Sequence, residues 1–215
     1  MRQVSIIILL VCVIVTGNIL PAFSAVNGRI EYSVPILYNN LDEKELVQKA
    51  NFYFANAEIL NNGMINENMT NALMLYNLLQ KINPANPEYS AKLGALQGKI
   101  GKDDMARKNF TKAIKIDSKN PVTNFYLGEY YYDRDFYFRA IKCYNETYKH
   151  NKNDYYLLYK MGDLYEKFGD TRSALKYLNE AKQQCSTPEL EAKIKRIEAQ
   201  NTVNNVYYSD TRIRG

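Results

Sequence analysis

The chain has 215 residues, of which 46% are hydrophobic, and this is enough for one domain with a substantial buried core. Its formal net charge at pH 7 is only +5, and its Lys and Arg residues are spread along the chain without a basic block. The missing basic patch therefore argues against a nucleic-acid partner, and the charge pattern indicates no preference for a membrane surface.

The N-terminus has the pattern of a secretory signal peptide. Arg2 supplies a positive charge, and the ten residues 6–15 (IIILLVCVIV) are all apolar. Ten residues are too few to span a bilayer, which needs about 20. Small residues at Ala22, Ser24 and Ala25 suit cleavage after Ser24 or Ala25. We therefore expect an exported protein, periplasmic or secreted, with no transmembrane helix after cleavage; an uncleaved N-terminal anchor is the alternative.

After an irregular lead-in at residues 26–43, the pattern becomes helical. Lys44–Leu60 and Thr70–Ile82 each place their apolar residues on one face, as amphipathic helices do. The polar segment Asn61–Asn68 between them predicts a long loop. Together these segments predict a first helix pair with a lengthened turn.

From Ala72 onward, small residues recur with a period of 34 residues. The glycines are Gly94, Gly128 and Gly162, and each follows a large apolar residue (Leu93, Leu127 and Met161). The alanines are Ala72, Ala106, Ala140 and Ala174, and the residues four positions later are Tyr76, Phe110, Tyr144 and Leu178. A period of about 20–50 residues indicates a repeat architecture. Because small residues suit places where two helices cross closely, each repeat is expected to be a helix pair that buries its apolar face against the next pair.

The repeat that begins at residue 87 shows the parts of one unit. Tyr89–Ile100 and Asp103–Ile116 each carry an apolar stripe at helical spacing. Gly101–Asp103 between them is a short turn with an acidic helix start. Asp117–Pro121 ends the unit with a Pro that suits the first turn of the next helix. The unit is thus predicted to be two antiparallel helices.

These units resemble the tetratricopeptide repeat (TPR). The first helices that match are LGALQG (Leu93–Gly98), LGEYYY (Leu127–Tyr132) and MGDLYE (Met161–Glu166). The second helices that match are MARKNF (Met105–Phe110), RAIKCY (Arg139–Tyr144) and SALKYL (Ser173–Leu178). The family's Trp position holds Ser90, Asn124 and Leu158, and its buried Tyr position holds Gln97, Tyr131 and Tyr165. The resemblance implies an all-α protein, a right-handed superhelix of antiparallel helix pairs (a TPR-like α-solenoid).

The expected layout follows from the period and from the resemblance. Residues 1–25 are the signal peptide and 26–43 the lead-in. The solenoid covers 44–199, with a degenerate repeat at 44–86, repeats at 87–120, 121–154 and 155–188, and a capping helix at 187–200. Residues 201–215 lack helical periodicity and are predicted to be a flexible tail.

One stripe of the first helices carries aromatic and acidic residues. It holds Phe125, Glu129, Tyr132 and Asp133 in one unit, and Tyr156, Tyr159, Asp163 and Glu166 in the next. In TPR proteins this stripe lines the concave groove, so the resemblance implies that these residues form a partner-binding groove. Tyrosines are frequent binding hot spots, and the carboxylates favour a peptide with basic and apolar residues. An ordinary solvated face is the alternative.

No pattern in the sequence predicts catalysis, a metal or a cofactor. His150 is the only histidine, and on a helix it lies about 10 Å from Cys143, too far for a hydrogen bond. One His and the separated Cys143 and Cys185 do not make a zinc site, and we do not expect these cysteines to pair. The sequence has no G-x-x-x-x-G-K phosphate loop. We therefore expect no small-molecule substrate.

These features predict a non-catalytic protein–protein interaction module of the cell envelope. It would bind a peptide or protein segment in the concave groove, and by resemblance it would act in envelope assembly or secretion. Two other hypotheses stand beside this one. The chain could be a regulatory or scaffolding subunit of an envelope enzyme complex, or a structural envelope component that associates with itself.

Overall fold

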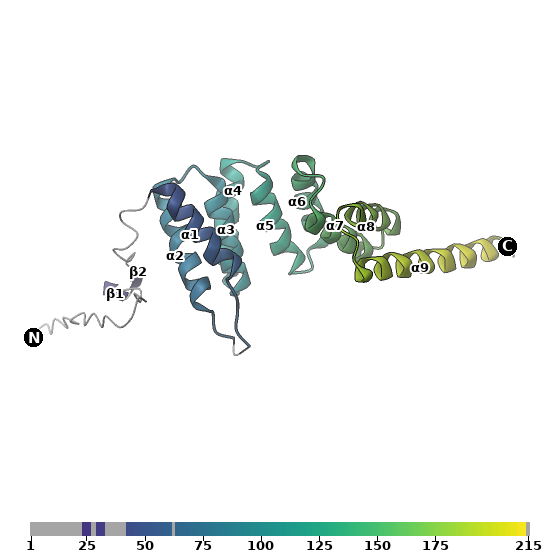
Figure 1. Ribbon diagram of the computed structural model, residues 1–215, viewed down its shortest axis with the longest axis horizontal. Coiled ribbons are helices and arrows are strands. Elements are labelled where there is room, and N and C mark those ends of the chain that lie inside the picture. The colour runs from purple at the N-terminus through teal and green to yellow at the C-terminus, as the bar shows by residue number, and fades with distance from the viewer. Residues whose placement is uncertain (1–22, 27–28, 33–41, 62, 214–215) are drawn as a thin grey trace, which may run out of the picture.

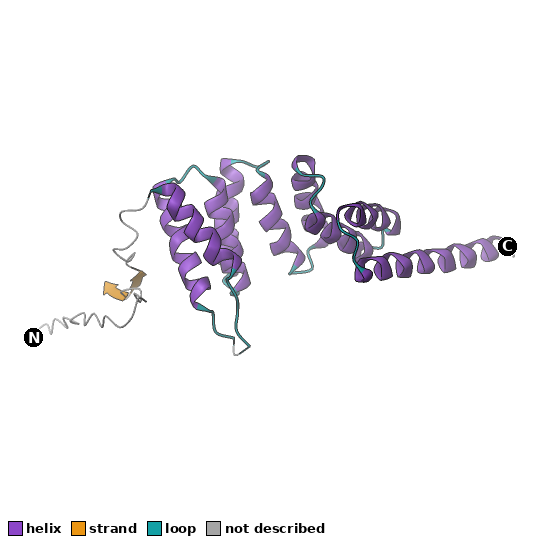
Figure 2. Ribbon diagram, viewed as in Figure 1, coloured by secondary structure: helices purple, strands orange, loops and turns teal. Residues whose placement is uncertain are grey.

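The computed structural model describes residues 23–26, 29–32, 42–61 and 63–213 (Figure 1). These residues form nine α-helices and two short strands (Figure 2). The helices follow one another in a row in chain order, and the C-terminal helix extends away from the rest (Figure 1). The all-α solenoid predicted from the sequence is therefore confirmed, with one small hairpin added at its N-terminal end.

The helices stack as successive pairs. Their bounds are α1 (Glu43–Ala55), α2 (Glu67–Ile82), α3 (Pro87–Lys99), α4 (Asp103–Ile116), α5 (Pro121–Tyr132), α6 (Tyr137–His150), α7 (Tyr155–Phe168), α8 (Thr171–Gln184) and α9 (Pro188–Ile213). Each of α1, α3, α5 and α7 packs against the helix that follows it, and α9 packs against α8. Neighbouring pairs also touch through α2 and α3, α3 and α5, and α6 and α7. The core is thus continuous along the stack, as expected for a repeat protein.

Asn and Asp residues determine where most of the helices begin. A side-chain oxygen accepts a backbone N–H two or three residues later at Asp42, Asn66, Asn86, Asn120, Asp154 and Asp170. Such caps satisfy N–H groups that have no partner inside the helix. Pro87 and Pro121 also stand in the first turn of α3 and α5, where their fixed φ suits the helix.

In the three repeats formed by α3 to α8, the two helices cross at a glycine. A Cβ at Gly128 would lie 2.6 Å from Tyr144 Cε1, and a Cβ at Gly162 would lie 2.5 Å from Leu178 Cγ. At Gly94 a Cβ would lie 3.2 Å from Phe110 Cδ2. The other buried members of the repeat signature are Leu93, Ala106, Ala140, Met161 and Ala174. Glycine is needed at the crossing because the large residue of the second helix fills the space that a side chain would take.

One column of the core differs from the prediction. The residues expected to pack there, Tyr131 and Tyr165, are only half-buried. Leu127 is half-buried too, although Leu93 and Met161, at the same position of the neighbouring repeats, are buried. The buried residues are Leu96, Tyr130 and Leu164, which share the same 34-residue spacing. The reason is visible at Gly98 of α3, where a Cβ would lie 2.7 Å from Tyr130 Cδ2. Tyr130 therefore fills the gap left by this glycine, and Tyr131 is turned toward the helix end, where its ring meets the edge of Phe136.

The first helix pair begins and ends at other residues than predicted. α1 stops at Ala55 instead of Leu60, and α2 begins at Glu67, before Thr70. Asn66 explains the early stop, because its side chain donates a hydrogen bond to the Asn56 carbonyl (2.9 Å) and accepts one from the Glu58 N–H (3.2 Å). These bonds hold the chain in a loop that would otherwise continue α1.

The N-terminal end contains a hairpin where an irregular lead-in was predicted. β1 (Phe23–Val26) pairs antiparallel with β2 (Arg29–Tyr32). The sequence between them is Asn-Gly, a strong hairpin signal that the prediction overlooked. Residues 1–22 of the predicted signal peptide lie outside the described residues, and the expected cleavage sites at Ser24 and Ala25 fall within β1.

The C-terminal end is helical where a flexible tail was predicted. α9 runs on to Ile213, so most of the segment 201–215 continues the predicted capping helix. No Gly or Pro follows Pro188 until Gly215, so nothing in the sequence breaks the helix earlier. In this segment the missing apolar periodicity therefore does not mark the end of the helix.

Candidate partner-binding site

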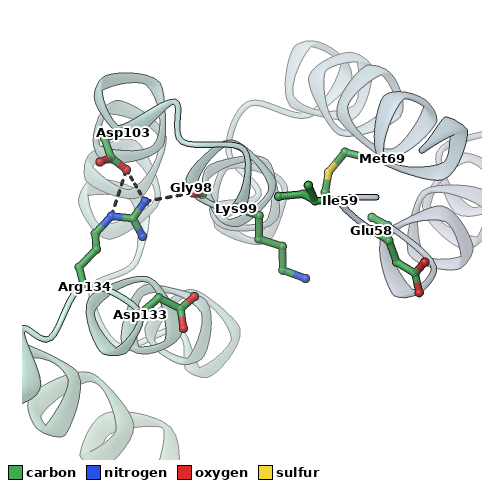
Figure 3. Close-up of a pocket in the computed structure, with 9 residues that line it drawn as sticks. Glu58, Ile59, Met69, Gly98, Lys99, Asp103, Asp133 and Arg134 are labelled. Atoms are coloured by element: carbon green, nitrogen blue, oxygen red, sulfur yellow. Dashed lines mark hydrogen bonds and ion pairs between the residues drawn. The ribbon is translucent and has the colours of Figure 1, made fainter. Parts of the chain in front are cut away.

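Two adjoining cavities open where the first helices of the pairs lie next to one another. The inner pocket, of about 220 Å³, is lined by Phe54, Ala95, Gly98, Lys99, Phe125, Tyr126, Glu129, Tyr130, Asp133, Arg134 and Tyr156. The outer pocket, of about 710 Å³ and more open, is lined by Ala57, Glu58, Ile59, Met69, Gly98, Lys99, Asp103, Asp133 and Arg134 (Figure 3). Residues of α1, α3, α5 and α7 meet in the inner pocket, and we call the surface formed by these helices the inner face.

The structure divides the predicted groove into two parts. Phe125, Glu129, Asp133 and Tyr156 line the inner pocket. Tyr132, Tyr159, Asp163 and Glu166 lie farther along. Side chains of α9 contact Tyr159, Asp163 and Glu166, and Tyr132 donates a hydrogen bond to Asp163. The eight residues therefore do not form one uninterrupted open surface. The part next to α9 is occupied by the chain itself.

Aromatic rings from three helices form the walls of the inner pocket. Phe54 of α1 meets Tyr126 of α5 edge to face, with ring centroids 5.2 Å apart. Phe125 lies 5.3 Å from Tyr126 and 5.9 Å from Tyr156 of α7, again between ring centroids. The rings thus provide a continuous apolar lining, whose edges and faces suit apolar groups and cations.

Glu129 is already engaged inside the protein. Its carboxylate accepts hydrogen bonds from the hydroxyls of Tyr144 and Tyr156, the second at 2.8 Å. Lys160 lies 3.6 Å from the same carboxylate. Burial, and then the negative charge of Glu129, raise the pKa of Tyr144 and keep it a hydrogen-bond donor. Glu129 therefore joins α5, α6 and α7, and it is not a free carboxylate for a partner.

Asp133 is the carboxylate of the inner pocket that lacks a partner. Within the described part of the chain, no side chain forms a hydrogen bond or an ion pair with it. Burial raises the pKa of this carboxyl, and Glu129 raises it further, while Lys160, Arg134 and Lys99 act in the opposite direction. Figure 3 shows Asp133, Lys99 and Glu58 pointing toward the same open space. Asp133 is thus an exposed carboxylate at the junction of the two pockets, without a hydrogen-bond or ion-pair partner in the described part of the chain.

Arg134 fixes one wall of both pockets. Its Nε lies 3.0 Å from Asp103 Oδ1, and its Nη2 donates to the Gly98 carbonyl (3.0 Å) (Figure 3). Its guanidinium also stacks 3.9 Å from the Tyr130 ring centroid. The Arg134 hydrogen bonds lower the pKa of Asp103. The sequence suggested that Asp103 caps a helix, but α4 has no side-chain cap. Asp103 instead holds Arg134, and together with the Gly98 and Tyr130 carbonyls it occupies four of the five N–H donors of this arginine.

The second part of the predicted groove is an ion-pair cluster with α9. Lys193 lies 2.5 Å from Asp163 Oδ1 and 2.8 Å from Glu166 Oε2, and Arg196 lies 2.6 Å from Glu166 Oε1. Tyr132 donates its hydroxyl hydrogen to Asp163. Burial acts to raise the pKa of Asp163, but the hydrogen bonds from Lys193 and Tyr132 outweigh it and leave this pKa below its usual range. These carboxylates are therefore neutralised within the chain.

The cysteines and the histidine lie apart from this site. Cys143 is buried in α6, where burial raises the pKa of its thiol to about 11, and Cys185 is exposed; neither forms a disulfide within the described residues. His150 is exposed at the end of α6. Across the described ranges, no group of three or more His, Cys, Asp or Glu side chains is placed to hold a metal ion. None of the helices described is both long and apolar enough to cross a membrane.

The sequence prediction missed several residues of the inner pocket. Phe54 was read as part of a helix in a degenerate repeat, and Ala95, Lys99, Tyr126 and Arg134 were not singled out. A usable signal existed, because Tyr126 stands at the same helix position as Lys92 and Lys160, 34 residues before and after it. An aromatic residue in a column of lysines marks a place where one repeat differs in chemistry from its neighbours.

Comparison with known proteins identifies the fold. No protein-family model and no curated protein sequence matches the chain. Among solved structures, Pseudomonas aeruginosa PilF is similar with a TM-score of 0.61 and 15% identity, over 80% of this chain and 76% of that one. MamA matches with a TM-score of 0.57 and 16% identity, over 79% and 88% of the two chains. TTC0263, a thermophilic TPR protein of Thermus thermophilus, matches with a TM-score of 0.55 and 18% identity, over 74% and 82%. The chain therefore has the fold of a tetratricopeptide-repeat solenoid.

Proposed function

We propose that this protein is a non-catalytic interaction module that holds a peptide segment of a partner protein against its inner face, at the inner pocket. One observation carries the proposal. Four first helices meet around a pocket with aromatic walls, and its carboxylate, Asp133, has no partner within the described residues. A repeat solenoid uses such a surface for binding because its backbone is rigid and extended.

The size of the inner pocket favours a side chain over a small-molecule ligand. Its volume of about 220 Å³ is below the roughly 300–1,000 Å³ typical of small-molecule sites. The outer pocket is larger but open, with loop residues Glu58 and Ile59 on its far wall. A peptide could place one side chain in the inner pocket and continue across the outer one. Tyrosine and phenylalanine walls suit this mode, since they offer rigid contact area.

We also propose that the protein acts in the cell envelope, in assembly or secretion. The support is the N-terminal pattern of a positive residue, an apolar run and small residues. The mass of the mature protein isolated from envelope fractions tests this proposal. Loss of the first 24 or 25 residues is expected, and an intact Met1 would contradict a cleaved signal.

Site-specific crosslinking in cells tests the interaction proposal. A photo-crosslinking amino acid replaces Lys99, an exposed residue at the rim of the inner pocket, or Lys115, an exposed residue on the second helix α4. We expect one defined protein to be crosslinked from position 99 and not from position 115. A fragment of that protein should then compete for the crosslink in purified material. Crosslinks of equal yield from both positions, or none from position 99, would contradict the proposal.

A further inference from the structure

Equivalent positions of neighbouring first helices touch one another along the inner face. The sixth residue is a lysine in α3, α7 and α9, and it contacts the ninth residue of the preceding first helix. The three contacts are Lys92 Nζ to Asn51 Oδ1 (2.7 Å), Lys160 Nζ to Glu129 Oε2 (3.6 Å) and Lys193 Nζ to Asp163 Oδ1 (2.5 Å). We call this row of contacts the lysine ladder. It links α1 to α3, α5 to α7, and α7 to α9.

The lysine ladder is interrupted between α3 and α5. The sixth residue of α5 is Tyr126 and the ninth residue of α3 is Ala95, so this junction has neither the lysine nor its acceptor. Both residues line the inner pocket. Among the described first helices, the pocket therefore opens at the junction where the ladder contact is replaced by a small residue and a ring.

Each lysine of the ladder also lies over a tyrosine ring. Lys160 Nζ is 4.3 Å from the centroid of Tyr132 and 5.2 Å from that of Tyr156, and Lys193 Nζ is 5.5 Å from that of Tyr159. Lys92 Nζ is 5.6 Å from the Tyr76 centroid. The protein thus repeatedly places an ammonium between a polar acceptor and aromatic rings. The inner pocket offers similar surroundings, the rings of Phe54 and Tyr126 and the carboxylate of Asp133. Its own ammonium, that of Lys99, is exposed at the rim, 5.9 Å from the Phe54 ring centroid, and forms no hydrogen bond or ion pair within the described residues.

We infer that the inner pocket receives a Lys or Arg side chain of the partner peptide, which completes the lysine ladder from outside. The aliphatic part of that side chain lies against Phe54, Tyr126 and Phe125, and its charged end lies near Asp133. This inference rests on the proposed function and specifies the chemistry that the pocket recognises.

Charge favours a basic over an acidic ligand side chain. Arg134 is held by Asp103 and by the Gly98 and Tyr130 carbonyls, which leaves Lys99, at the rim, as the cation of the pocket without a hydrogen bond or ion pair within the described residues. An acidic ligand would meet Glu129 and Asp133 in the pocket and Glu58 at its rim. A basic ligand instead pairs Asp133, which has no hydrogen-bond or ion-pair partner within the described residues, and the surrounding rings attract its cation.

The test uses the full-length chain and four capped tripeptides, acetyl-Leu-X-Leu-amide with Lys, Arg, norleucine or Glu at X, titrated by two-dimensional NMR of backbone amides. The Lys and Arg peptides should shift the amides of Lys99, Tyr126 and Asp133 in a saturable way. Norleucine keeps the aliphatic stem without the charge and should bind about tenfold more weakly, and the Glu peptide should bind least.

Two variants make the test specific to the pocket. Asp133→Asn should lower the affinity for the Lys peptide about fivefold to tenfold and leave the affinity for the norleucine peptide unchanged. Ala95→Met, which fills the cavity, should lower the affinity for both peptides. Asp104→Asn removes an exposed carboxylate on α4 and serves as the matched control, with no expected effect. Circular dichroism confirms that each variant is folded.

The failures of the two proposals are distinguishable. If the Lys and norleucine peptides bind equally, or if Asp133→Asn changes neither, the inference is wrong even when crosslinking at position 99 has identified a partner. The same holds if none of the tripeptides binds and the crosslinked partner segment keeps its affinity after its Lys and Arg residues are replaced by norleucine. Crosslinking without a defined partner would instead overturn the proposed function itself.

Discussion

The ammonium of Lys193 on α9 lies 2.5 Å from the Asp163 carboxylate on α7 and 2.8 Å from that of Glu166. The side chains of this first pair are largely shielded from water, with exposed fractions of 14% for Lys193 and 17% for Asp163. α9 therefore occupies the position of the first helix of a further pair. It ends the inner face, and a contact of the lysine ladder joins it to α7.

Replacing Lys193 should loosen α9. The Lys193→Met variant leaves Asp163 and Glu166 partly buried without their main cation, which we expect to cost about 1–3 kcal/mol, between the values for exposed and buried ion pairs. Urea unfolding followed by circular dichroism measures this cost. Lys195→Met, an exposed lysine on the same helix, is the control and should change stability little. Equal losses in the two variants would show that the ion pairs do not hold α9.

The same contact predicts a pH dependence. Burial acts against both charges, but the mutual hydrogen bonds lower the pKa of Asp163 and raise that of Lys193. Asp163 therefore adds to the free energy of unfolding at pH values above its unfolded pKa of about 3.9. This stabilisation is lost as the pH falls through the lower pKa of the folded state. Lys193 adds to the free energy of unfolding at pH values below its unfolded pKa of about 10.4. This stabilisation is lost as the pH rises through the higher pKa of the folded state.

Hydrogen exchange of the α9 amides across this pH range tests the linkage. Protection should be greatest between the two limits and decline toward both, and Lys193→Met should flatten the profile. The groups that face the pair are Tyr132, Glu166, Lys167 and Arg196, so Tyr132→Phe and Glu166→Gln are useful comparisons. A wild-type profile as flat as that of Lys193→Met would contradict the linkage.

The sequence was sufficient for the repeat fold because the period records helix crossings. Position 128 must be glycine because Tyr144 fills the space beside it. A Cβ there would lie 2.6 Å from the Tyr144 ring. Such constraints recur in each repeat and can be read without knowing how the repeats are arranged. The end of α9 was missed for the converse reason, because its last turns carry no apolar periodicity from which to predict them.

Ala140 gives the corresponding stability test. It is fully buried in the core shared by α5 to α8, so Ala140→Leu should overpack the crossing and cost about 1–3 kcal/mol. Lys142→Leu, two residues along the same helix, is exposed and should cost far less. Thermal unfolding by circular dichroism compares the variants. If both lose the same stability, the crossing at Gly128 does not limit the space at Ala140.

Asp135 allows a test of backbone strain. It has a φ of 60° at the turn position that glycine occupies in the neighbouring repeats, as Gly101 (75°) and Gly169 (85°). Left-handed φ costs a residue with a side chain about 1–2 kcal/mol, and Asp tolerates it better than Ala. Asp135→Gly should therefore be more stable than Asp135→Ala by about 1 kcal/mol. Both variants lose the Tyr137 hydrogen bond to Asp135, so that bond cancels in the comparison of their thermal melts. An equal melting temperature would mean that the turn relaxes away from this φ.

The site was predicted only in part, for a physical reason. Helical spacing put Phe125, Glu129, Asp133 and Tyr156 in the predicted groove, and in the structure these four residues line one cavity. It could not show that α9 returns to Asp163 and Glu166, because that contact depends on how a later helix stacks. Nor could it show that Glu129 is satisfied by tyrosines of two other helices. An acidic stripe in the sequence therefore became one unpaired carboxylate among the described residues of the inner pocket.

Tyr132 illustrates the consequence for mutagenesis. Read from the sequence, Tyr132 and Tyr159 are groove residues whose replacement by Ala would weaken partner binding and leave stability unchanged. In the structure, Tyr132 donates a hydrogen bond to Asp163, and Lys160 and Lys167 lie 4.3 and 4.7 Å from its ring centroid. Tyr159 stacks on Tyr155 and lies under Lys193.

We therefore expect Tyr132→Ala to destabilise the protein as well. Tyr132→Phe removes only the hydroxyl, and it should cost about 1–2 kcal/mol because Asp163 loses a donor in a partly buried place. Asp163 should also titrate at a higher pKa in that variant, which NMR of its side-chain carboxyl carbon can follow. Tyr53→Phe, a half-buried tyrosine of α1 away from the ion pairs, is the control. If Tyr132→Phe keeps wild-type stability and leaves the pKa of Asp163 unchanged, Tyr132 is free to serve the partner, as the sequence first indicated.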